Sequence, residues 1–399
     1  MNICMISYWS CPLTPTGVLT AGGMNIYVIN LVNNLGKLGH NVDVYTRVHS
    51  QKDEKILTGN KNVRIIHLDS GKLGNYKQFA LKVEKFIKKE DINYDIIHAH
   101  YYFSGLVAIQ IKNKLKIPLI TTFHSLEIAK EVYVGKKNKS RKKNERKVVE
   151  KSDGIIASTE LEKVDLIKTY GAYNHKIFIV SPGVNHHLFF PRNKIFSRLK
   201  LKLPLKKEII LFVGRIDPIK GLSVLIEAIG KLTRLYPSFS KKFRVLLIGG
   251  DIENRKFWEN SEVKKIRRLI KEKELECCIH FIGSKPHSKL PYYYSAADIT
   301  VLPSLYESFG LVILEAMACG CAVIASKTGG MKYIIRDGES GRFFRNNDME
   351  ELSLVLWELL HDKKYLLELG KNAIGESLNY CWDKQSQKVV KVYKKFGSN

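Results

Sequence analysis

The chain of 399 residues lacks the signatures of several protein classes. It has no run of about 18 apolar residues, so no segment is predicted to span a membrane. Seven cysteines are scattered, with one adjacent pair (Cys277 and Cys278), and their spacing matches neither a zinc site nor a disulfide framework. No Gly-x-Gly-x-x-Gly motif occurs, which weighs against a nicotinamide or flavin enzyme. The absence of a membrane span and of a disulfide framework predicts a cytoplasmic protein.

Acidic residues are few, with 39 Asp and Glu against 65 Lys and Arg, a formal net charge of +26. This excess favours acidic partners such as nucleotide diphosphates, phosphorylated substrates or anionic lipid, without choosing among them. The densest basic run, from Lys130 to Lys151, is interpreted mainly as a solvated helix face. Without a zinc-finger spacing or a basic run interleaved with aromatics, no specific nucleic-acid partner is expected. Metal-ligand spacing is also missing, so no metal or other cofactor is predicted.

Short apolar runs alternate with helical stretches from end to end, which is typical of parallel α/β sheets. We expect two doubly wound, Rossmann-like domains that face each other across a cleft, residues 1–190 and 191–377. A C-terminal helix, about 378–399, belongs to the second domain or packs back on the first. Strands are predicted at Asn2–Ser7, Asn41–Thr46, Val63–His67, Ile96–His98, Leu119–Thr122, Gly154–Ala157, Ile177–Val180, Glu208–Val213, Arg244–Gly249, Ile279–Ile282, Ile299–Leu302, Ala322–Ser326 and Gly341–Phe344.

Two cations follow the strand that ends at Val213. The segment from Gly214 to Gly221 contains Arg215 and Lys220 and precedes an amphipathic helix. Ligands of open α/β sheets sit at the carboxyl ends of strands. Arg215 and Lys220 are therefore placed where a diphosphate could be held by charge-assisted bonds.

Glu307 and Glu315 bracket a Phe-Gly-Leu turn, and a helix rich in small residues follows. Free backbone N–H groups at a helix start suit a diphosphate, and carboxylates accept hydrogen bonds from sugar hydroxyls. A helix that starts near Phe309 would separate the carboxylates by roughly 12 Å, the reach from sugar to ribose in a nucleotide sugar. A surface helix with two solvated glutamates is the alternative.

In the first half, Gly22 and Gly23 open a helix, where paired glycines allow close approach of an anion or a sugar. Three histidines lie at strand ends. His98 is expected to cap a strand or pack near the core, while His124 is expected to project into the cleft as the better functional candidate.

Together these motifs resemble glycosyltransferase family 4, retaining enzymes of the GT-B fold. The resemblance covers nearly the whole chain in family order and is nearest to the sucrose-phosphate synthase and mycothiol glycosyltransferase branches. The matching segments are Gly22–Asn25, Gly39-His40, His98-x-His100, Thr122–His124, Ser181–Val184, Gly214-Arg215 with Lys220-Gly221, Ala297-Asp298, Glu307–Glu315 and Gly329-Gly330.

The resemblance implies a nucleotide-diphosphate sugar, UDP-linked by preference, as co-substrate. It assigns the diphosphate to Arg215 and Lys220, the transferred sugar to Glu307 and the ribose to Glu315. The backbone of Phe309, Gly310 and Leu311 would support phosphate and sugar, His124 would face the sugar near the reacting centre, and Gly22, Gly23 and Gly214 would permit close approach. His124, Arg215, Lys220 and Glu307 form the predicted catalytic set.

In the mycothiol branch a phosphorylated acceptor is held by the first domain. Tyr101, Ser125 and Arg141 match its positions here. Lys77 is a fourth candidate, on a stretch from Asp69 to Phe79 that is shorter than the corresponding loop of that branch. The predicted function is hexose transfer to a hydroxyl of a small, phosphorylated acceptor. Two alternatives remain: a transferase of polysaccharide or lipid-linked glycan at the inner membrane face, and a non-catalytic nucleotide-sugar-binding module.

Overall fold

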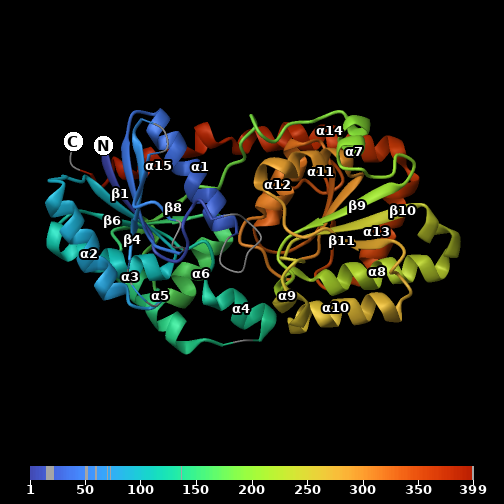
Figure 1. Cartoon of the computed structure of the whole chain (residues 1–399), viewed down its shortest axis with the longest axis horizontal. Helices are drawn as coiled ribbons and strands as arrows, with labels where there is room; N and C mark the ends of the chain where they lie inside the picture. The colour runs from blue at the N-terminus through green and yellow to red at the C-terminus, as the bar shows by residue number, and fades with distance from the viewer. Residues whose placement is uncertain are drawn as a thin grey trace. The chain divides into compact units, whose positions relative to one another are not determined.

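The computed structural model describes residues 1–14, 22–49, 53–58, 61–69, 71, 73–135 and 137–397. Its residues separate into two compact units (Figure 1). One unit contains the described residues up to Gly183 together with the C-terminal segment from Trp382, and the other spans Val184–Cys381. The chain therefore passes from the first unit to the second and returns at its end.

The first unit is built on a parallel sheet in the order β3-β4-β2-β1-β5-β6-β7-β8, in which only β3 is antiparallel to its neighbour. Its strands are β1 (Asn2–Ser7), β2 (Asn41–Arg47), β3 (Ile56–Thr58), β4 (Val63–Leu68), β5 (Ile96–His100), β6 (Leu119–Thr122), β7 (Gly154–Ala157) and β8 (Ile177–Ile179). Its helices are α1 (Gly23–Lys37), α2 (Tyr76–Lys89), α3 (Tyr102–Leu115), α4 (Glu127–Val134), α5 (Lys139–Lys151), α6 (Glu160–Tyr170) and α15 (Trp382–Tyr393).

The second unit holds a parallel sheet in the order β11-β10-β9-β12-β13-β14. Its strands are β9 (Glu208–Val213), β10 (Phe243–Ile248), β11 (Ile279–Phe281), β12 (Ile299–Leu302), β13 (Ala322–Ser326) and β14 (Arg342–Phe344). Its helices are α7 (Lys194–Lys200), α8 (Leu222–Leu235), α9 (Arg255–Glu259), α10 (Ser261–Glu272), α11 (Leu290–Ala296), α12 (Leu311–Ala318), α13 (Met349–His361) and α14 (Lys363–Ser377).

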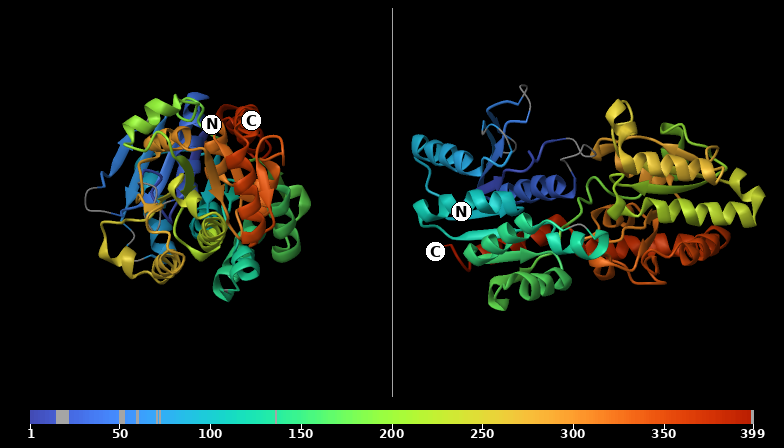
Figure 2. Two further views of the ribbon diagram at one scale, coloured as in Figure 1. Left: turned by 90° about the vertical axis from the view of Figure 1, so that its right-hand side faces the viewer. Right: turned by 90° about the horizontal axis from the view of Figure 1, so that it is seen from below.

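Both sheets are covered by helices on their two faces, as Figures 1 and 2 show. Parallel strands that are buried on both faces read as continuous apolar runs. The central strand β9 is an example, because Ile209, Leu211 and Val213 pack into one core cluster while Ile210 and Phe212 pack into another. The predicted α/β class with two doubly wound domains is confirmed.

The helix α15 completes the first unit beside α1 (Figure 1). The Trp382 ring lies edge-on to the Tyr27 ring of α1, with their centroids 5.1 Å apart. A side chain at Gly183 would collide with the backbone of Trp382, which lies within 2.9 Å of the position of a Cβ. The C-terminal helix is thus a packed part of the first unit's core.

Candidate active site

The loop after β9 packs tightly on the end of β12. Gly221 has a φ of 62°, and a Cβ there would collide with the carbonyl of Pro303. This close approach brings Lys220 beside the loop that follows β12, where its Nζ forms an ion pair with the Glu307 carboxylate. The structure therefore joins two of the predicted catalytic residues directly.

Arg215 lies two residues beyond the end of β9, with an exposed side chain. No hydrogen bond or ion pair connects its guanidinium to another of the described residues. The turn beneath it is tight, since a Cβ at Gly249 would collide with the Gly214 carbonyl. Arg215 thus stands at the carboxyl edge of the sheet with its charge available to an anion.

The helix α12 starts later than the sequence indicated. It begins at Leu311, because Gly310 adopts a φ of 105° and ends the preceding loop. Its first internal hydrogen bond runs from Leu314 N to Gly310 O at 3.1 Å. Glu307 precedes the helix, and Glu315 lies about one turn inside it. The expected separation of roughly 12 Å assumed a helix that starts near Phe309, so it does not follow from this helix. The backbone N–H groups of the first turn remain suited to an anion.

Gly329 and Gly330 lie directly against the loop from Glu307 to Phe309. Gly330 N donates to Glu307 O at 2.8 Å. A Cβ on Gly329 would collide with the Glu307 carbonyl, and a Cβ on Gly330 would collide with Phe309 Cα. The Phe309 ring is buried, with its centroid 5.7 Å from that of Tyr380. The Phe309 ring is therefore part of the core and is not available to a ligand.

Glu315 is buried in a polar group that the sequence did not reveal. Its Oε1 lies 2.6 Å from His287 Nε2, and its Oε2 accepts a hydrogen bond from the Tyr294 hydroxyl at 3.0 Å. Burial, together with the Glu315 charge, raises the pKa of Tyr294 well above its usual value, so this tyrosine stays a donor. These partners fix the Glu315 carboxylate and leave lone pairs for further donors.

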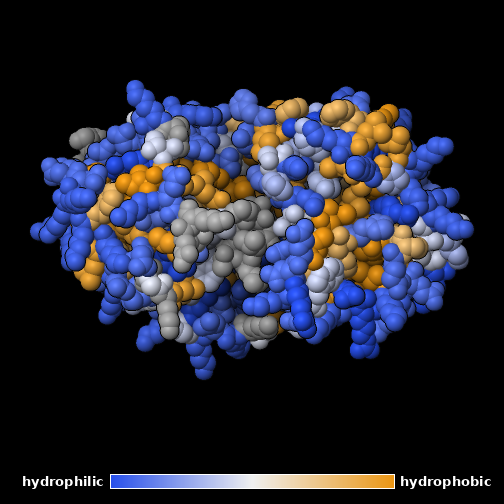
Figure 3. All heavy atoms as spheres, viewed as in Figure 1, coloured by the Kyte–Doolittle hydropathy of each residue, from blue (hydrophilic) through white to orange (hydrophobic). Residues whose placement is uncertain are grey.

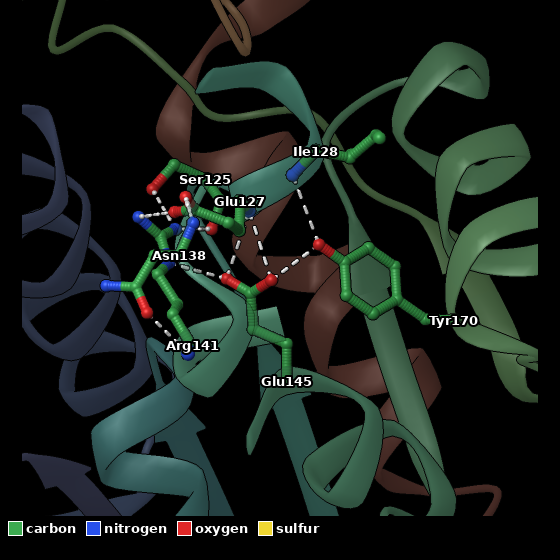
Figure 4. A network of polar contacts seen from close by, with 7 residues as sticks. All are labelled: Ser125, Glu127, Ile128, Asn138, Arg141, Glu145 and Tyr170. Carbon is green, nitrogen blue, oxygen red and sulfur yellow. Dashed lines mark hydrogen bonds and ion pairs between the residues drawn. The ribbon is translucent and has the colours of Figure 1, made fainter. Parts of the chain in front are cut away.

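In the first unit, Arg141 is the centre of a buried polar network, drawn in Figure 4. Its Nε donates to Glu145 Oε1 at 2.7 Å, and its Nη1 lies 3.3 Å from Glu127 Oε2. Its Nη2 donates to the carbonyl of Ser125 at 2.9 Å and to the Ser125 hydroxyl at 3.2 Å. Glu145 also accepts from the Tyr170 hydroxyl at 2.5 Å. Arg141 thus ties α5 to the segment between β6 and α4.

Tyr101 joins this group, whereas Lys77 does not. Tyr101 has a φ of 75°, and its N–H donates to the Thr122 carbonyl at 2.8 Å. The Arg141 guanidinium carbon lies 5.1 Å from the centroid of the Tyr101 ring. Lys77 is exposed in the first turn of α2, and the described residues show no interaction between it and Tyr101, Ser125 or Arg141.

His124 ends a chain of polar contacts among buried histidines. It has a φ of 61°, is half-buried, and its Nε2 lies 3.0 Å from His100 Nδ1. The ring of His98 lies 4.2 Å from that of His100, and its Nδ1 lies 2.6 Å from the Tyr393 hydroxyl of α15. Burial lowers the pKa of His98 and of His124 to about 3 and that of His100 well below its usual value. All three are therefore neutral at pH 7.

The arrangement of the two rings assigns their protons. His100 Nε2 is buried and finds no hydrogen-bond partner among the described residues. An unpaired buried N–H costs more than an unpaired lone pair, so the His100 proton belongs on Nδ1, where it is donated to His124 Nε2. His124 then carries its own proton on Nδ1. It is consequently a hydrogen-bond donor at that atom, not a base.

Gly22 and Gly23 lie at the start of α1, as predicted. Gly22 has an extended φ of −164°, and a Cβ there would meet no described atom within 4 Å. Asn25 holds this end in place, with its Oδ1 3.3 Å from Gly22 N and its Nδ2 2.8 Å from the Ser10 hydroxyl. The backbone at Gly22 therefore does not itself require glycine.

The basic run from Lys130 to Lys151 is partly neutralised within the first unit. Glu131 lies between Lys142, at 2.9 Å, and Lys137, at 3.4 Å, while Arg141 is buried in its own network. Across the described residues, no helix is both long and apolar enough to cross a membrane. The same residues contain no cluster of three or more His, Cys, Asp or Glu that could hold a metal ion.

Comparison with known proteins finds relatives along nearly the whole chain. A family model described as Glycosyltransferase Family 4 matches residues 21–188, and one described as Glycosyl transferases group 1 matches residues 193–376. The chain is 31% identical to a D-inositol 3-phosphate glycosyltransferase of Corynebacterium glutamicum (strain R), over 98% of this chain and 96% of the relative.

Solved structures agree. Sucrose-phosphate synthase from Thermosynechococcus elongatus has a TM-score of 0.89 and 29% identity, covering 99% of this chain and 98% of that one. Anabaena Alr3699/HepE, solved in complex with UDP and glucose, shares the fold with a TM-score of 0.77 at 19% identity, covering 99% and 100% of the two chains. The chain therefore belongs to the family 4 glycosyltransferases and is an enzyme of the GT-B fold.

Proposed function

We propose that the protein transfers a hexose from a UDP-linked sugar to a hydroxyl of a small phosphorylated acceptor, an inositol phosphate or a sugar phosphate, with retention of the anomeric configuration. The observation that carries the proposal is the ion pair between Lys220 and Glu307 next to the free start of α12. The names of the relatives, an inositol 3-phosphate glycosyltransferase and a sucrose-phosphate synthase, support the phosphorylated acceptor.

The second unit would bind the donor. Arg215 and Lys220 would neutralise the diphosphate, and the first backbone N–H groups of α12 would donate to its oxygens. Glu307, held by Lys220, would accept from hydroxyls of the transferred sugar. Glu315, held by His287 and Tyr294, would accept from the ribose hydroxyls with its remaining lone pairs.

The chemical step needs no protein nucleophile in this proposal. The bond between the anomeric carbon and the diphosphate oxygen breaks, and the acceptor oxygen bonds to the same face of the sugar. The acceptor proton passes to the departing phosphate. Arg215 and Lys220 would stabilise the charge that grows on the diphosphate, and His124 would donate from Nδ1 to a hydroxyl of the sugar. Catalysis would thus come from positioning and neutralisation.

The first unit would bind the acceptor. The contacts of Arg141 with Glu145, Ser125 and Glu127 use its Nε–H, both N–H groups of Nη2 and one of Nη1, which leaves one of five donors for a ligand. Arg141 would therefore fix Ser125 and Tyr101 and contribute one bond itself. Tyr101 and Ser125 would supply hydroxyls to the acceptor phosphate, and Lys77 would add a cation from α2. Residues 1–190 with the C-terminal helix would form the acceptor domain.

A nucleoside-diphosphate release assay tests the proposal by crossing UDP-, GDP- and ADP-sugars with inositol phosphate, fructose 6-phosphate and their unphosphorylated counterparts. We expect release with a UDP-sugar that rises when a phosphorylated acceptor is added. Preference for the unphosphorylated acceptors would contradict the assigned acceptor class. Tight nucleotide binding without release for any pair would favour the non-catalytic alternative.

A further inference from the structure

The short helix α7 (Lys194–Lys200) packs on the second unit with its polar side inward. The Arg198 Nη2 group lies 2.7 Å from Asp298 Oδ2, and Lys194 pairs with the other oxygen of the same carboxylate. Ser197 is fully buried on the same side. These contacts anchor α7 through hydrogen bonds and ion pairs.

The apolar residues of α7 face outward. Ile195, Phe196 and Leu199 are 61%, 56% and 60% exposed. At about 100° per residue these three side chains fall within one arc of roughly 100°, opposite Ser197 and Arg198. A surface helix normally turns its apolar stripe to the core and its charges to water. The polarity of α7 is the reverse, which indicates a second apolar environment outside the unit.

Cations and aromatic rings extend this surface. The Arg192 guanidinium carbon lies 4.0 Å from the ring centroid of Phe190, which is 44% exposed, and 4.9 Å from that of Tyr292. Lys200 Nζ lies 4.2 Å from the Tyr292 ring and 5.8 Å from the Phe196 ring.

We call Phe190, Ile195, Phe196 and Leu199 the α7 patch. Figure 3 shows apolar surface over the part of the second unit where Figure 1 draws α7.

The segment that carries the α7 patch is basic, although Asp298 neutralises Lys194 and the buried Arg198 within the unit. Residues 186–207 include seven Lys and Arg and no Asp or Glu (Arg192, Lys194, Arg198, Lys200, Lys202, Lys206 and Lys207). Two copies of the chain joined through this patch would bring like charges together, which disfavours self-association. An occupant must therefore combine negative charge with an apolar layer.

We propose that the α7 patch is a docking surface for an anionic lipid bilayer. Ile195, Phe196 and Leu199 stand out from an exposed helix face, where they can enter the boundary between headgroups and acyl chains. The exposed Lys200, Lys202 and Lys206 can reach lipid phosphates while their aliphatic stems cover apolar surface. The patch contains none of the residues assigned to donor or acceptor, so docking concentrates the enzyme at a membrane without altering its chemistry.

Co-sedimentation with vesicles tests the proposal on the full chain at about 0.15 M salt. The probe is an equal mixture of phosphatidylglycerol and phosphatidylcholine, with pure phosphatidylcholine as the comparison. The variant Ile195→Asn/Leu199→Asn removes the apolar face. The matched control Leu354→Asn/Leu367→Asn alters two side chains of the same unit that are 66% and 72% exposed. We expect the first variant to lose at least about tenfold in partitioning, and the control to bind like the wild type.

A fluorescence variant gives a second readout. Phe196→Trp should shift its emission to shorter wavelength with the acidic vesicles and not with phosphatidylcholine alone. Three results would overturn the proposal. These are no binding of the wild type to acidic vesicles, equal binding by the Ile195→Asn/Leu199→Asn variant, and a concentration-dependent dimer in sedimentation velocity that this variant abolishes. Turnover of soluble substrates by the variant is expected to match the wild type, so failure here is separable from failure of the proposed reaction.

Discussion

Replacing Lys220 by alanine separates catalysis from stability. The Lys220 and Glu307 side chains are 18% and 19% exposed, and they form one ion pair. The substitution removes a cation from the proposed diphosphate site and leaves the Glu307 carboxylate without its partner. Loss of one preorganised donor costs on the order of 10²–10³ in kcat, or about 2.7–4 kcal/mol of barrier. We expect kcat/KM for nucleoside-diphosphate release to fall by that factor.

The stability of Lys220→Ala should change far less, because a single partly exposed ion pair contributes about 1 kcal/mol or less. Urea denaturation measures this free energy of unfolding. Lys273→Ala is the matched control, since Lys273 Nζ forms an ion pair with Glu227 at 2.9 Å in the same unit. The control should lose a similar small stability and keep full turnover.

A double-mutant cycle with Glu307→Gln then measures the coupling of the pair. If Lys220 acts on the diphosphate as well as on Glu307, the double variant should be slower than Glu307→Gln alone. Wild-type turnover by Lys220→Ala, measured with saturating donor, would refute the assignment of a charge-stabilising role.

Three further predictions concern packing and protonation. Gly330→Ala would force a methyl group against Phe309 Cα, so we expect UDP to raise the melting temperature of this variant less than that of the wild type. The control Gly375→Ala places its methyl group where no described atom lies within 4 Å, and it should keep the full UDP-induced shift. Equal shifts in the two variants would contradict this prediction. Arg141→Met leaves the buried carboxylates of Glu127 and Glu145 without their cation, so the free energy of unfolding, measured by urea denaturation, should fall by about 3–5 kcal/mol. A loss below about 1 kcal/mol would contradict the central place of Arg141 in this network. Because the pKa of His98 is lowered to about 3 by burial, unfolding takes up a proton below pH 6.5. Stability should therefore fall as pH drops from about 6.5 toward 3, by about 2 kcal/mol per buried histidine between pH 7 and pH 5. A His98→Asn variant should show a shallower decline in pH-dependent urea denaturation, and an unchanged slope would argue against the buried neutral state.

The strands were predictable because buried parallel strands are short apolar runs between polar turns. Asn2–Ser7, Leu119–Thr122 and Ala322–Ser326 have the predicted bounds. The strand Ile56–Thr58 was missed, since it has only three residues at an exposed edge and shows no apolar run. Apolar runs in the sequence therefore identify buried central strands better than short edge strands.

The start of α12 could not be placed from residue type alone. Phe309 is compatible with a helix, but the φ of 105° at Gly310 makes Gly310 the residue before the first turn. That conformation is favoured by glycine and by the close packing of Gly329 and Gly330 against the loop. This packing depends on a segment about twenty residues further along the chain.

Side-chain partners far apart in sequence were the least predictable part of the site. His98 and Tyr393 meet across 295 positions, and His287 meets Glu315 across 28. Arg141 and Glu145, in contrast, are four residues apart on one helix, a spacing that favours contact. The candidate residues could thus be named from motifs, while their partners required the fold.

A crystal structure of the protein with bound UDP tests the central claim most directly. The account predicts diphosphate oxygens within hydrogen-bond distance of Lys220 Nζ and of the Leu311 backbone N–H, with ribose hydroxyls at the Glu315 carboxylate. A nucleotide bound away from the loops that follow β9 and β12 would contradict it.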